Sequence, residues 1–320
     1  MHLLLTGGTG YLGGILVRTL STKYTVRVLV RDRNRAAPLL PRSAHLVEGH
    51  LQDRDSLKEA LRGCDAVFHL AALVKSWVPD KSLFEKTNVE GFRNLAELSW
   101  EQGVQRFVYT SSFLALGPTD TPSKKETFQN PYVASKRKAL ELARSYQKGG
   151  YPLVTAIPTV LYGPGALTEG NHVAQMLKHL LSGKFPGWID GGKWRWNFAF
   201  VADVAEGEQL VFEKGRLGKE YILGGETVSL KDFMTQAAVA AGCPVPKKEI
   251  PSPLLLGYAA FQEWMAGLFR LEPSLTRGIL ETYRHDWVYP DDIARAELGY
   301  TTTPLREALT KTVQWLKGSL

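Results

Sequence analysis

Short apolar runs alternate with amphipathic stretches through the first half of the chain. Runs rich in Leu, Val and Ile predict strands, and segments with apolar residues at helical spacing predict helices. The predicted strands cover residues 3–5, 25–30, 44–48, 66–70, 106–110 and 152–157, and the predicted helices include 56–61, 82–102 and 132–148. This alternation predicts an α/β fold, a doubly wound parallel sheet with helices on both faces and its ligand at the carboxyl ends of the strands.

The regular alternation ends after Pro158, where Gly, Pro and Trp become frequent. A strand-like run follows at 197–201, a helix near Asp203, and two apolar helices at 254–269 and 304–317. We therefore expect a dinucleotide-binding domain over 1–160 and a smaller mixed lobe over 161–320. That lobe is expected to be mostly substrate-binding, with segments near 197–206 and 220–224 returning to the core.

The first predicted strand stops at glycines. Gly7, Gly10 and Gly13 have G-x-x-G-x-x-G spacing, and an apolar helical pattern follows them. A strand that turns through glycines into a helix collects free backbone N–H groups and a positive helix end at one point, which suits a pyrophosphate. The plain alternative is a strand–loop–helix with small residues, but the position between strand and helix favours a dinucleotide site of Rossmann type.

Composition narrows the class of partner. The 320 residues are 44% hydrophobic and 22% charged, with a net charge of +7 and scattered basic residues, so anionic small ligands or a negatively charged surface are expected and nucleic acid is not. Cys64 and Cys243 form neither a disulfide framework nor a metal cluster and indicate free thiols in a reducing, cytoplasmic compartment. No metal site is expected. No signal peptide is expected at the N-terminus, and no run reaches the ~18 apolar residues that span a bilayer.

Candidate chemistry lies at the end of the fifth strand and on the following helix. Tyr132 and Lys136 are four residues apart on a predicted helix, hence on one face. A nearby ammonium is expected to lower the pKa of the phenol, which makes the pair a candidate for moving a proton to or from an alcohol oxygen. The fifth strand ends in Tyr109-Thr-Ser-Ser112, which places hydroxyl groups at the carboxyl edge of the sheet.

Several motifs in order along the chain resemble those of the extended short-chain dehydrogenase/reductase family, part of the NAD-dependent epimerase/dehydratase superfamily. They are Thr6-Gly-Gly-Thr-Gly-Tyr-Leu-Gly13, Asp65-Ala-Val-Phe-His-Leu-Ala-Ala72, Asn88-Val-Glu-Gly-Phe-Arg-Asn-Leu95, Val108-Tyr-Thr-Ser-Ser112, Tyr132 with Lys136, Pro158 with Tyr162-Gly-Pro-Gly165, and Phe200-Val-Ala-Asp-Val204. Within the family, the chain looks most similar to the dihydroflavonol-reductase-like and farnesol-dehydrogenase-like branch.

The resemblance implies catalytic roles. Tyr132 would be the general acid/base and Lys136 its electrostatic partner, which also holds the nicotinamide ribose. Ser112 would bind the reacting oxygen, with Ser111 as the alternative. Asn88 would fix a helix kink and a water in the proton path; a helix-capping or buried structural amide is the alternative for this residue.

The resemblance also implies a cofactor-binding set along the carboxyl edge of the sheet. Its members are Gly7, Thr9, Gly10, Tyr11, Leu12, Gly13, Arg31, Asp32, Arg35, His50, Leu51, Leu70, Ala71, Ala72, Thr110, Tyr132, Lys136, Pro158 and Val160, and Asp65 is expected beside the adenosine. Because Arg31 follows the second strand, NADP(H) is favoured, with Arg31 on the 2′-phosphate. NAD(H) is the alternative cofactor, since Asp32 is adjacent and relatives of this type with basic residues at this position use NAD. The structural alternative is that these arginines are solvated loop residues without a role in cofactor binding.

The chain departs from the family pattern at three places. His50 stands where an aspartate usually faces the adenine, and Ile157 replaces an arginine before Pro158. Trp196 and Asn197 stand where sugar-nucleotide enzymes carry the Arg-Asp pair whose arginine clamps a diphosphate, although Arg195 is one residue away. The loss of that arginine weakens the prediction of a nucleotide-sugar substrate.

Apolar residues near the predicted site suggest a hydrophobic substrate. Phe113, Leu114 and Trp196 are the substrate candidates, and plain core packing is the alternative for each. The segment 254–269 is more apolar than a surface helix requires, and a pocket lid, a subunit contact and a peripheral membrane contact all stay open. A homodimer through helices 82–102 and 132–148, or a monomer, is expected.

The functional prediction is an NADP(H)-preferring oxidoreductase that interconverts an alcohol and a carbonyl on a small hydrophobic molecule. A nucleotide-sugar epimerase or dehydratase with bound NAD is the first alternative. A non-catalytic dinucleotide-sensing protein is the second, and the intact Ser112, Tyr132 and Lys136 argue against it.

Overall fold

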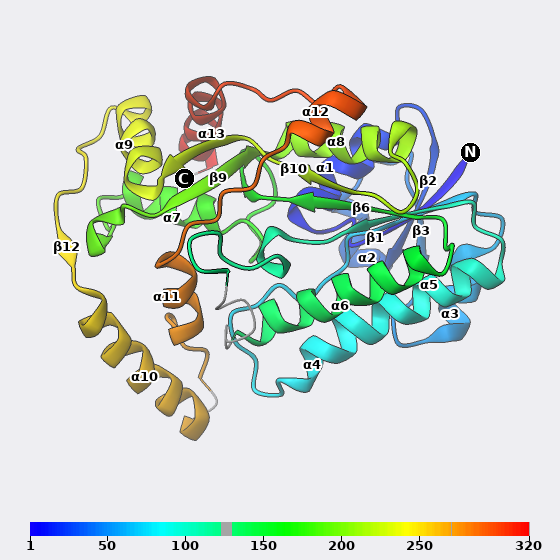
Figure 1. Cartoon of the computed structure of the whole chain (residues 1–320), viewed down its shortest axis with the longest axis horizontal. Coiled ribbons are helices and arrows are strands. Elements are labelled where there is room, and N and C mark those ends of the chain that lie inside the picture. Colours follow the sequence, from blue (N-terminus) through cyan, green and yellow to red (C-terminus); the bar gives the residue numbers. More distant parts are fainter. Residues whose placement is uncertain (123–129, 270, 320) are drawn as a thin grey trace.

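The computed structural model describes residues 1–122, 130–269 and 271–319, and its centre is a seven-stranded parallel sheet (Figure 1). The strands lie in the order β10–β6–β5–β4–β1–β2–β3, and every neighbouring pair is parallel. Their bounds are β1 His2–Thr6, β2 Thr25–Val30, β3 His45–Glu48, β4 Ala66–His69, β5 Arg106–Thr110, β6 Leu153–Pro158 and β10 Glu220–Leu223. The order reverses direction between β1 and β4, so a ligand crevice is expected at their carboxyl ends. The predicted fold class is confirmed.

Helices cover both faces of this sheet (Figure 1). The helices α1 (Tyr11–Leu20) and α8 (Val201–Lys214) lie on one face, and α3 (Arg54–Leu61), α5 (Gly91–Glu101) and α6 (Pro131–Lys148) on the other. In β1, Leu3 and Leu5 pack into the first layer and Leu4 into the second, and all three are fully buried. A parallel strand covered on both faces is continuously apolar for this reason.

The predicted helix 82–102 is one helical run with a change of geometry inside it. It consists of α4 (Ser82–Glu85), a π-helical segment (Lys86–Glu90) and α5. A π-helical turn is wider than an α-turn and is frequent at functional sites. Asn88 lies in this segment and is 3% exposed.

The second half of the chain forms a smaller lobe around a three-stranded sheet. Its strands are β7 (Val160–Tyr162), β9 (Arg195–Phe200) and β11 (Glu226–Ser229), with β7 parallel and β11 antiparallel to β9. The helices α7 (His172–Leu181), α9 (Leu230–Ala241) and α13 (Leu305–Ser319) pack on this lobe around a core with Trp188, Phe198 and Phe233. From this half of the chain, β10 returns to the main sheet and α8 packs against α1.

The remaining elements lie at the edges of the lobe. The strands β8 (Trp188–Ile189) and β12 (Glu249–Ile250) pair in parallel. The chain continues from β12 into α10 (Ser252–Phe269) and α11 (Arg277–Tyr283), while α12 (Asp292–Leu298) lies against α8 and β10. Two short helices, α2 (Arg33–Ala36) and a 3₁₀ turn (Ala37–Leu39), follow β2. Within the described part of the chain, no helix is long and apolar enough to traverse a bilayer, and no cluster of three potential metal ligands is found.

Candidate active site

The glycine turn after β1 is shaped by close backbone contacts. Gly7 has φ +80°, and a Cβ there would lie 2.7 Å from the backbone N of Ala71. A Cβ on Gly13 would collide with the carbonyl oxygen of Gly7. Both positions therefore require glycine, one to bring the turn against the end of β4 and one to bring α1 against the turn.

The N-terminus of α1 fits a pyrophosphate. Gly10 caps the helix without a side-chain hydrogen bond, and the first turn contains no acidic residue. The first N–H groups of a helix have no partners within the helix, so those of Tyr11, Leu12 and Gly13 are available to an anion. The Tyr11 side chain has another task, since its hydroxyl donates to the carbonyl oxygen of Gly163 at 2.8 Å.

A buried threonine–histidine pair joins the turn to the end of β4. The hydroxyl of Thr6 lies 2.8 Å from Nδ1 of His69 and accepts a hydrogen bond from the N–H of Ala71 at 3.3 Å. Burial lowers the pKa of His69 to about 3, so the imidazole is neutral near pH 7. The N–H of Leu70 donates to the carbonyl oxygen of Thr6. Leu70 and Ala71, both predicted cofactor residues, therefore lie directly beside the glycine turn.

Ser112 and Tyr132 meet at the carboxyl end of β5. Asn130 caps α6 by accepting from the N–H groups of Tyr132 and Val133, and this cap fixes the position of Tyr132. Burial raises the pKa of Tyr132 to about 12, and the nearby Ser112 side chain acts in the opposite direction. The prediction that the Tyr132 pKa is lowered by Lys136 is wrong for this structure, because burial raises this pKa and outweighs the opposing Ser112 side chain.

Lys136 is buried and directs its ammonium group to β5. Its Nζ donates to the carbonyl oxygen of Thr110 at 3.0 Å and lies 5.1 Å from the ring centroid of Tyr109. Burial lowers the pKa of Lys136 to about 8, while the carboxylate of Glu208 raises it. Thr110, a predicted cofactor residue, therefore has its carbonyl oxygen committed to Lys136.

Glu208 is a member of this site that sequence reasoning missed. It comes from α8, is 0% exposed, and its Oε1 accepts from the hydroxyl of Thr110 at 2.8 Å. Burial raises the pKa of Glu208, and Lys136 and Thr110 act in the opposite direction. The sequence did contain a signal, because Glu208 shares the apolar face of its helix with Val204 and Val211. A charged residue at a core position indicates a partner.

Asn88 connects the π-helical segment to the loop after β4 and to α6. Its Oδ1 accepts from the N–H of Leu73 at 2.7 Å, and its Nδ2 donates to the Ser135 hydroxyl at 2.8 Å and to the Leu73 carbonyl at 3.3 Å. The amide is thus held by three hydrogen bonds to two residues. We call Asn88, Thr110, Lys136 and Glu208, together with Ser112 and Tyr132, the β5 end of the site.

The opposite end of the site, the β2 end, is open to solvent. Arg31 and His50 are exposed and line a shallow pocket together with Glu48, Gly49, Asp53 and Ser56. Asp32 caps α2 by accepting from the N–H of Arg35, and its carboxylate also pairs with the Arg35 guanidinium at 3.3 Å. Arg33 donates to the carbonyl oxygen of Leu46. Arg31 is therefore the arginine of this group that faces the pocket.

Three further predicted residues lie on the outer sides of these two ends, beyond β5 and beyond β2. Leu51 is buried against Gly91 at the start of α5, Pro158 ends β6, and Val160 begins β7. Asp65, in contrast, precedes β4 and accepts from the backbone N–H of His2 at 2.7 Å. It lies at the amino edge of the sheet, so the prediction that it flanks the adenosine is wrong.

The substrate candidates lie on the side of the second lobe. Phe113 packs edge-on against Trp287, with ring centroids 5.4 Å apart, and Phe113 and Leu114 are half-buried. Trp196 is 6% exposed, donates to the carbonyl oxygen of His285, and its ring centroid lies 4.8 Å from that of Tyr283. Its surroundings are those of a core residue, and a substrate contact for Trp196 remains a prediction.

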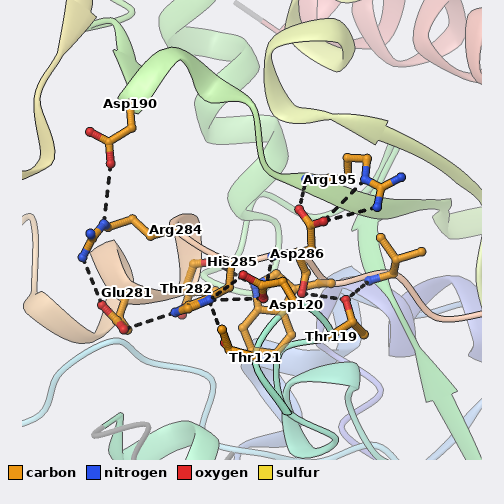
Figure 2. A network of polar contacts seen from close by, with 12 residues as sticks. Thr119, Asp120, Thr121, Asp190, Arg195, Glu281, Thr282, Arg284, His285 and Asp286 are labelled. Carbon is orange, nitrogen blue, oxygen red and sulfur yellow. Dashed lines mark hydrogen bonds and ion pairs between the residues drawn. The ribbon is translucent and has the colours of Figure 1, made fainter. Parts of the chain in front are cut away.

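A polar network fastens the loop after Ser112 to the segment 281–289 (Figure 2). The N–H and hydroxyl of Thr119 both donate to the Asp286 carbonyl, at 2.8 and 2.9 Å. The two ring nitrogens of His285 lie 3.1 Å from Asp120 and 3.2 Å from Glu281. The network joins residues more than 160 positions apart, and it fixes the wall that contains Phe113 and Trp287.

The same network occupies Arg195. Its backbone N–H and its guanidinium both contact the Asp286 carboxylate, at 2.7 and 3.4 Å (Figure 2). Asn197 is 4% exposed and is hydrogen-bonded to Gly225 and Thr227, where β11 pairs with β9. Neither side chain is directed to a diphosphate, which agrees with the departure from the sugar-nucleotide pattern at these positions.

Comparison with known proteins identifies relatives of this arrangement. The model of the NAD dependent epimerase/dehydratase family matches residues 3–224. A protein of Synechocystis sp. named "Putative dihydroflavonol 4-reductase" is 30% identical over 325 residues, covering 98% of this chain and 93% of the relative. A 4-hydroxy-2-methyl-3-oxo-4-farnesyl-3,4-dihydroquinoline-1-oxide ketoreductase of Stigmatella aurantiaca is 29% identical, covering 94% and 92%.

Solved structures agree with these relatives. The crystal structure of gox2253 superposes with a TM-score of 0.80 at 33% identity and covers 99% of this chain and 98% of its own. A double mutant of the dTDP-glucose 4,6-dehydratase DesIV from Streptomyces venezuelae, solved with NAD bound, superposes with a TM-score of 0.76 at 25% identity, covering 99% and 97%.

Proposed function

Since the chain belongs to the NAD dependent epimerase/dehydratase family, we propose that it interconverts an alcohol and a carbonyl on a hydrophobic small molecule with a preference for NADP(H). Its named relatives in this family are reductases and dehydrogenases, so the chain is an oxidoreductase. The observation that supports this reaction most directly is the proximity of the Ser112 and Tyr132 side chains at the carboxyl end of β5. It lies on the same sheet edge as the glycine turn.

The residues of the chain suffice to hold the dinucleotide. The turn of Gly7, Gly10 and Gly13 and the N-terminus of α1 would bind the pyrophosphate, and Arg31 would meet the 2′-phosphate. Lys136, Pro158 and Val160 lie toward the nicotinamide end. When bound, the nicotinamide supplies hydride to, or accepts it from, the carbon of the reacting group.

The protein's own contribution is to hold and move a proton. With its pKa raised to about 12, Tyr132 is a neutral phenol near pH 7, the form that donates a proton to a carbonyl oxygen. The Ser112 hydroxyl bonds to the same oxygen and orients it. The ammonium group of Lys136, which is hydrogen-bonded to Thr110 and stabilised by the Glu208 carboxylate, favours the phenolate that remains after proton transfer.

The substrate class follows from the walls of the site. Phe113 and Leu114 provide apolar surface next to Ser112, and Trp287 packs against Phe113. Arg195 is committed to Asp286, so the side chain nearest to the diphosphate clamp of sugar-nucleotide enzymes is engaged elsewhere. A hydrophobic ketone or alcohol therefore suits this site better than a nucleotide sugar.

A turnover screen tests the proposal. Hydrophobic ketones and alcohols of isoprenoid, steroid and flavonoid type are incubated with the purified protein and either cofactor, and nicotinamide absorbance is followed. We expect turnover of at least one class, faster with NADPH than with NADH. Turnover of a UDP- or dTDP-sugar without added cofactor, with no ketone reduced, would instead establish the epimerase or dehydratase alternative.

A further inference from the structure

In helix α10, large apolar side chains face outward and the polar side chains face the protein, which is the reverse of an ordinary surface helix. It lies at the periphery, at the lower left of Figure 1, and its main helical contact is α11. Large apolar side chains on it are 50% to 69% exposed. They are Leu254, Tyr258, Phe261, Trp264, Leu268 and Phe269. An ordinary surface helix carries charged and polar residues on this side.

The polar residues of α10 face the protein instead. Glu263 accepts from the backbone N–H and the guanidinium of Arg277, both at 2.7 Å. Gln262 accepts from the N–H and hydroxyl of Ser274, and Asp190 accepts from the N–H of Ser252 at the start of the helix. The helix is thus held in place by polar contacts on its inner side.

Its buried positions are small residues. Ser252, Ala259 and Ala266 are the buried residues of the helix, so little of its apolar surface is used to pack against the protein. The exposed positions 254, 258, 261, 264 and 268 recur at helical spacing and form one continuous outward stripe. No charged residue of α10 is classed as exposed. The outward stripe is suited to an apolar environment.

The charges around this stripe fit an anionic surface. The acids closest to it in sequence, Glu263 and Glu272, are paired with Arg277 and Lys75. Lys247 and Lys248, just before the helix, are exposed and form no ion pair with any residue that the structure describes; Glu249, also exposed, offsets one of them. The whole chain has a net charge of +7.

A second copy of the chain is the poorer occupant. An 18-residue helix is about 27 Å long and ~10 Å wide, so its outward stripe offers a few hundred Å². A stable dimer buries about 800 Å² on each partner. The stripe alone is too small for that, whereas a bilayer interface accepts a projecting helix with Trp and Tyr among its exposed residues.

We infer that α10 docks this protein on the surface of an anionic phospholipid bilayer, with Phe261, Trp264 and Leu268 inserted below the headgroups and Lys247 and Lys248 at the headgroup level. The geometry also links this surface to the candidate site. Gly278 of α11, the helix that α10 packs on, lies against Asn130, the residue that caps the Tyr132 helix. A docked protein would hold this end of α6 close to the membrane.

Co-sedimentation with vesicles tests the inference. The full chain is mixed with vesicles of phosphatidylcholine and phosphatidylglycerol, or of phosphatidylcholine alone. The triple variant Phe261→Ser, Trp264→Ser, Leu268→Ser should bind mixed vesicles more than tenfold more weakly, because three large apolar side chains are lost from the interface. Lys247→Ser and Lys248→Ser should each weaken binding to mixed vesicles about fivefold and leave the phosphatidylcholine arm nearly unchanged.

A matched control uses large apolar residues exposed on other elements. The variant Leu217→Ser, Val239→Ser, Ile293→Ser changes residues that are 50%, 70% and 57% exposed, and it should bind vesicles like the unchanged chain. Equal losses in the two triple variants would overturn the inference. So would failure of the unchanged chain to bind either vesicle, and a dimer in sedimentation velocity that the α10 triple variant abolishes would then identify a second copy as the occupant.

Discussion

The β5 end and the β2 end of the candidate site differ in how firmly their side chains are held. At the β5 end, Lys136 and Glu208 are 4% and 0% exposed, and both are hydrogen-bonded to Thr110. At the β2 end, Arg31 and His50 are exposed and border an open pocket.

This difference separates two tasks. A buried polar group that loses its partner keeps the full cost of desolvation, so a change at the β5 end alters the reaction steeply. An exposed arginine is surrounded by water and contributes a modest, graded amount to affinity. We therefore expect the β5 end to determine whether the protein reacts and the β2 end to determine which dinucleotide it prefers.

The largest expected effect is at the β5 end, in Tyr132→Phe. Removing the hydroxyl removes the proton donor, and kcat should fall by about 10³-fold. Dinucleotide affinity should change little, because the glycine turn and α1 are untouched. The measurement is kcat with the substrate found in the screen, together with a dinucleotide titration. Turnover within a few-fold of the unchanged protein would refute the proposed role of Tyr132.

The turn between the two ends should be the next most sensitive position. Gly7→Ala imposes a Cβ at φ +80° and places it 2.7 Å from Ala71, so both backbone strain and a collision oppose it. We expect a loss of about 2–5 kcal/mol in the free energy of unfolding and more than tenfold weaker dinucleotide binding.

A substitution at a second glycine, Gly63, separates the cost of the steric collision from the cost of backbone strain. Gly63 has φ +69° and open space around the position of a Cβ. Gly63→Ala should therefore cost only the ~1–2 kcal/mol of a left-handed residue. Denaturant unfolding of both variants makes the comparison, and equal losses would show that the contact with Ala71 is unimportant.

Much of this arrangement is predictable because it is local. The strand at residues 106–110 and the helix beginning at 132 follow from apolar spacing, and the structure has β5 at Arg106–Thr110 and α6 from Pro131. Residues four apart on a helix share a face, which brings Tyr132 and Lys136 to the same side.

The parts that sequence reasoning missed depend on long-range contacts. Glu208 is hydrogen-bonded to Thr110, which is 98 positions away in the sequence, and Asp120 contacts His285, which is 165 positions away. Local periodicity contains no information on such pairs. The predicted direction of the Tyr132 pKa shift was wrong for a related reason. The shift depends on how deeply the phenol is buried and on where the Lys136 ammonium points.

The effect of Glu208→Gln should be intermediate and visible in the pH profile. Glu208 raises the pKa of Lys136, which burial lowers to about 8. The Lys136 ammonium is present below this pKa and is lost as the pH rises through it. Without the carboxylate the pKa of Lys136 falls further, so the alkaline limb of kcat/KM should move to lower pH, and activity near pH 8 should fall about tenfold.

A shorter carboxylate is the control for this variant. Glu208→Asp keeps the negative charge and should leave the alkaline limb closer to its original position than Glu208→Gln does. If both variants lose activity equally at every pH, Glu208 acts only through packing. An unchanged alkaline limb in Glu208→Gln would contradict its influence on Lys136.

The smallest effect is expected at the β2 end, in Arg31→Ala. A charge-assisted hydrogen bond to phosphate is worth about 1.5–3 kcal/mol, and exposure of Arg31 to solvent favours the lower value. NADPH affinity should fall about tenfold while NADH affinity stays within about twofold. Arg33→Ala is the matched control, because the Arg33 guanidinium is bound to the Leu46 carbonyl, and it should leave the ratio of the two affinities unchanged.

Equal weakening of NADPH and NADH binding in Arg31→Ala would mean that Arg31 does not contact the 2′-phosphate. Asp32, whose carboxylate is held by Arg35, would then be the next residue to test for a preference for NAD(H).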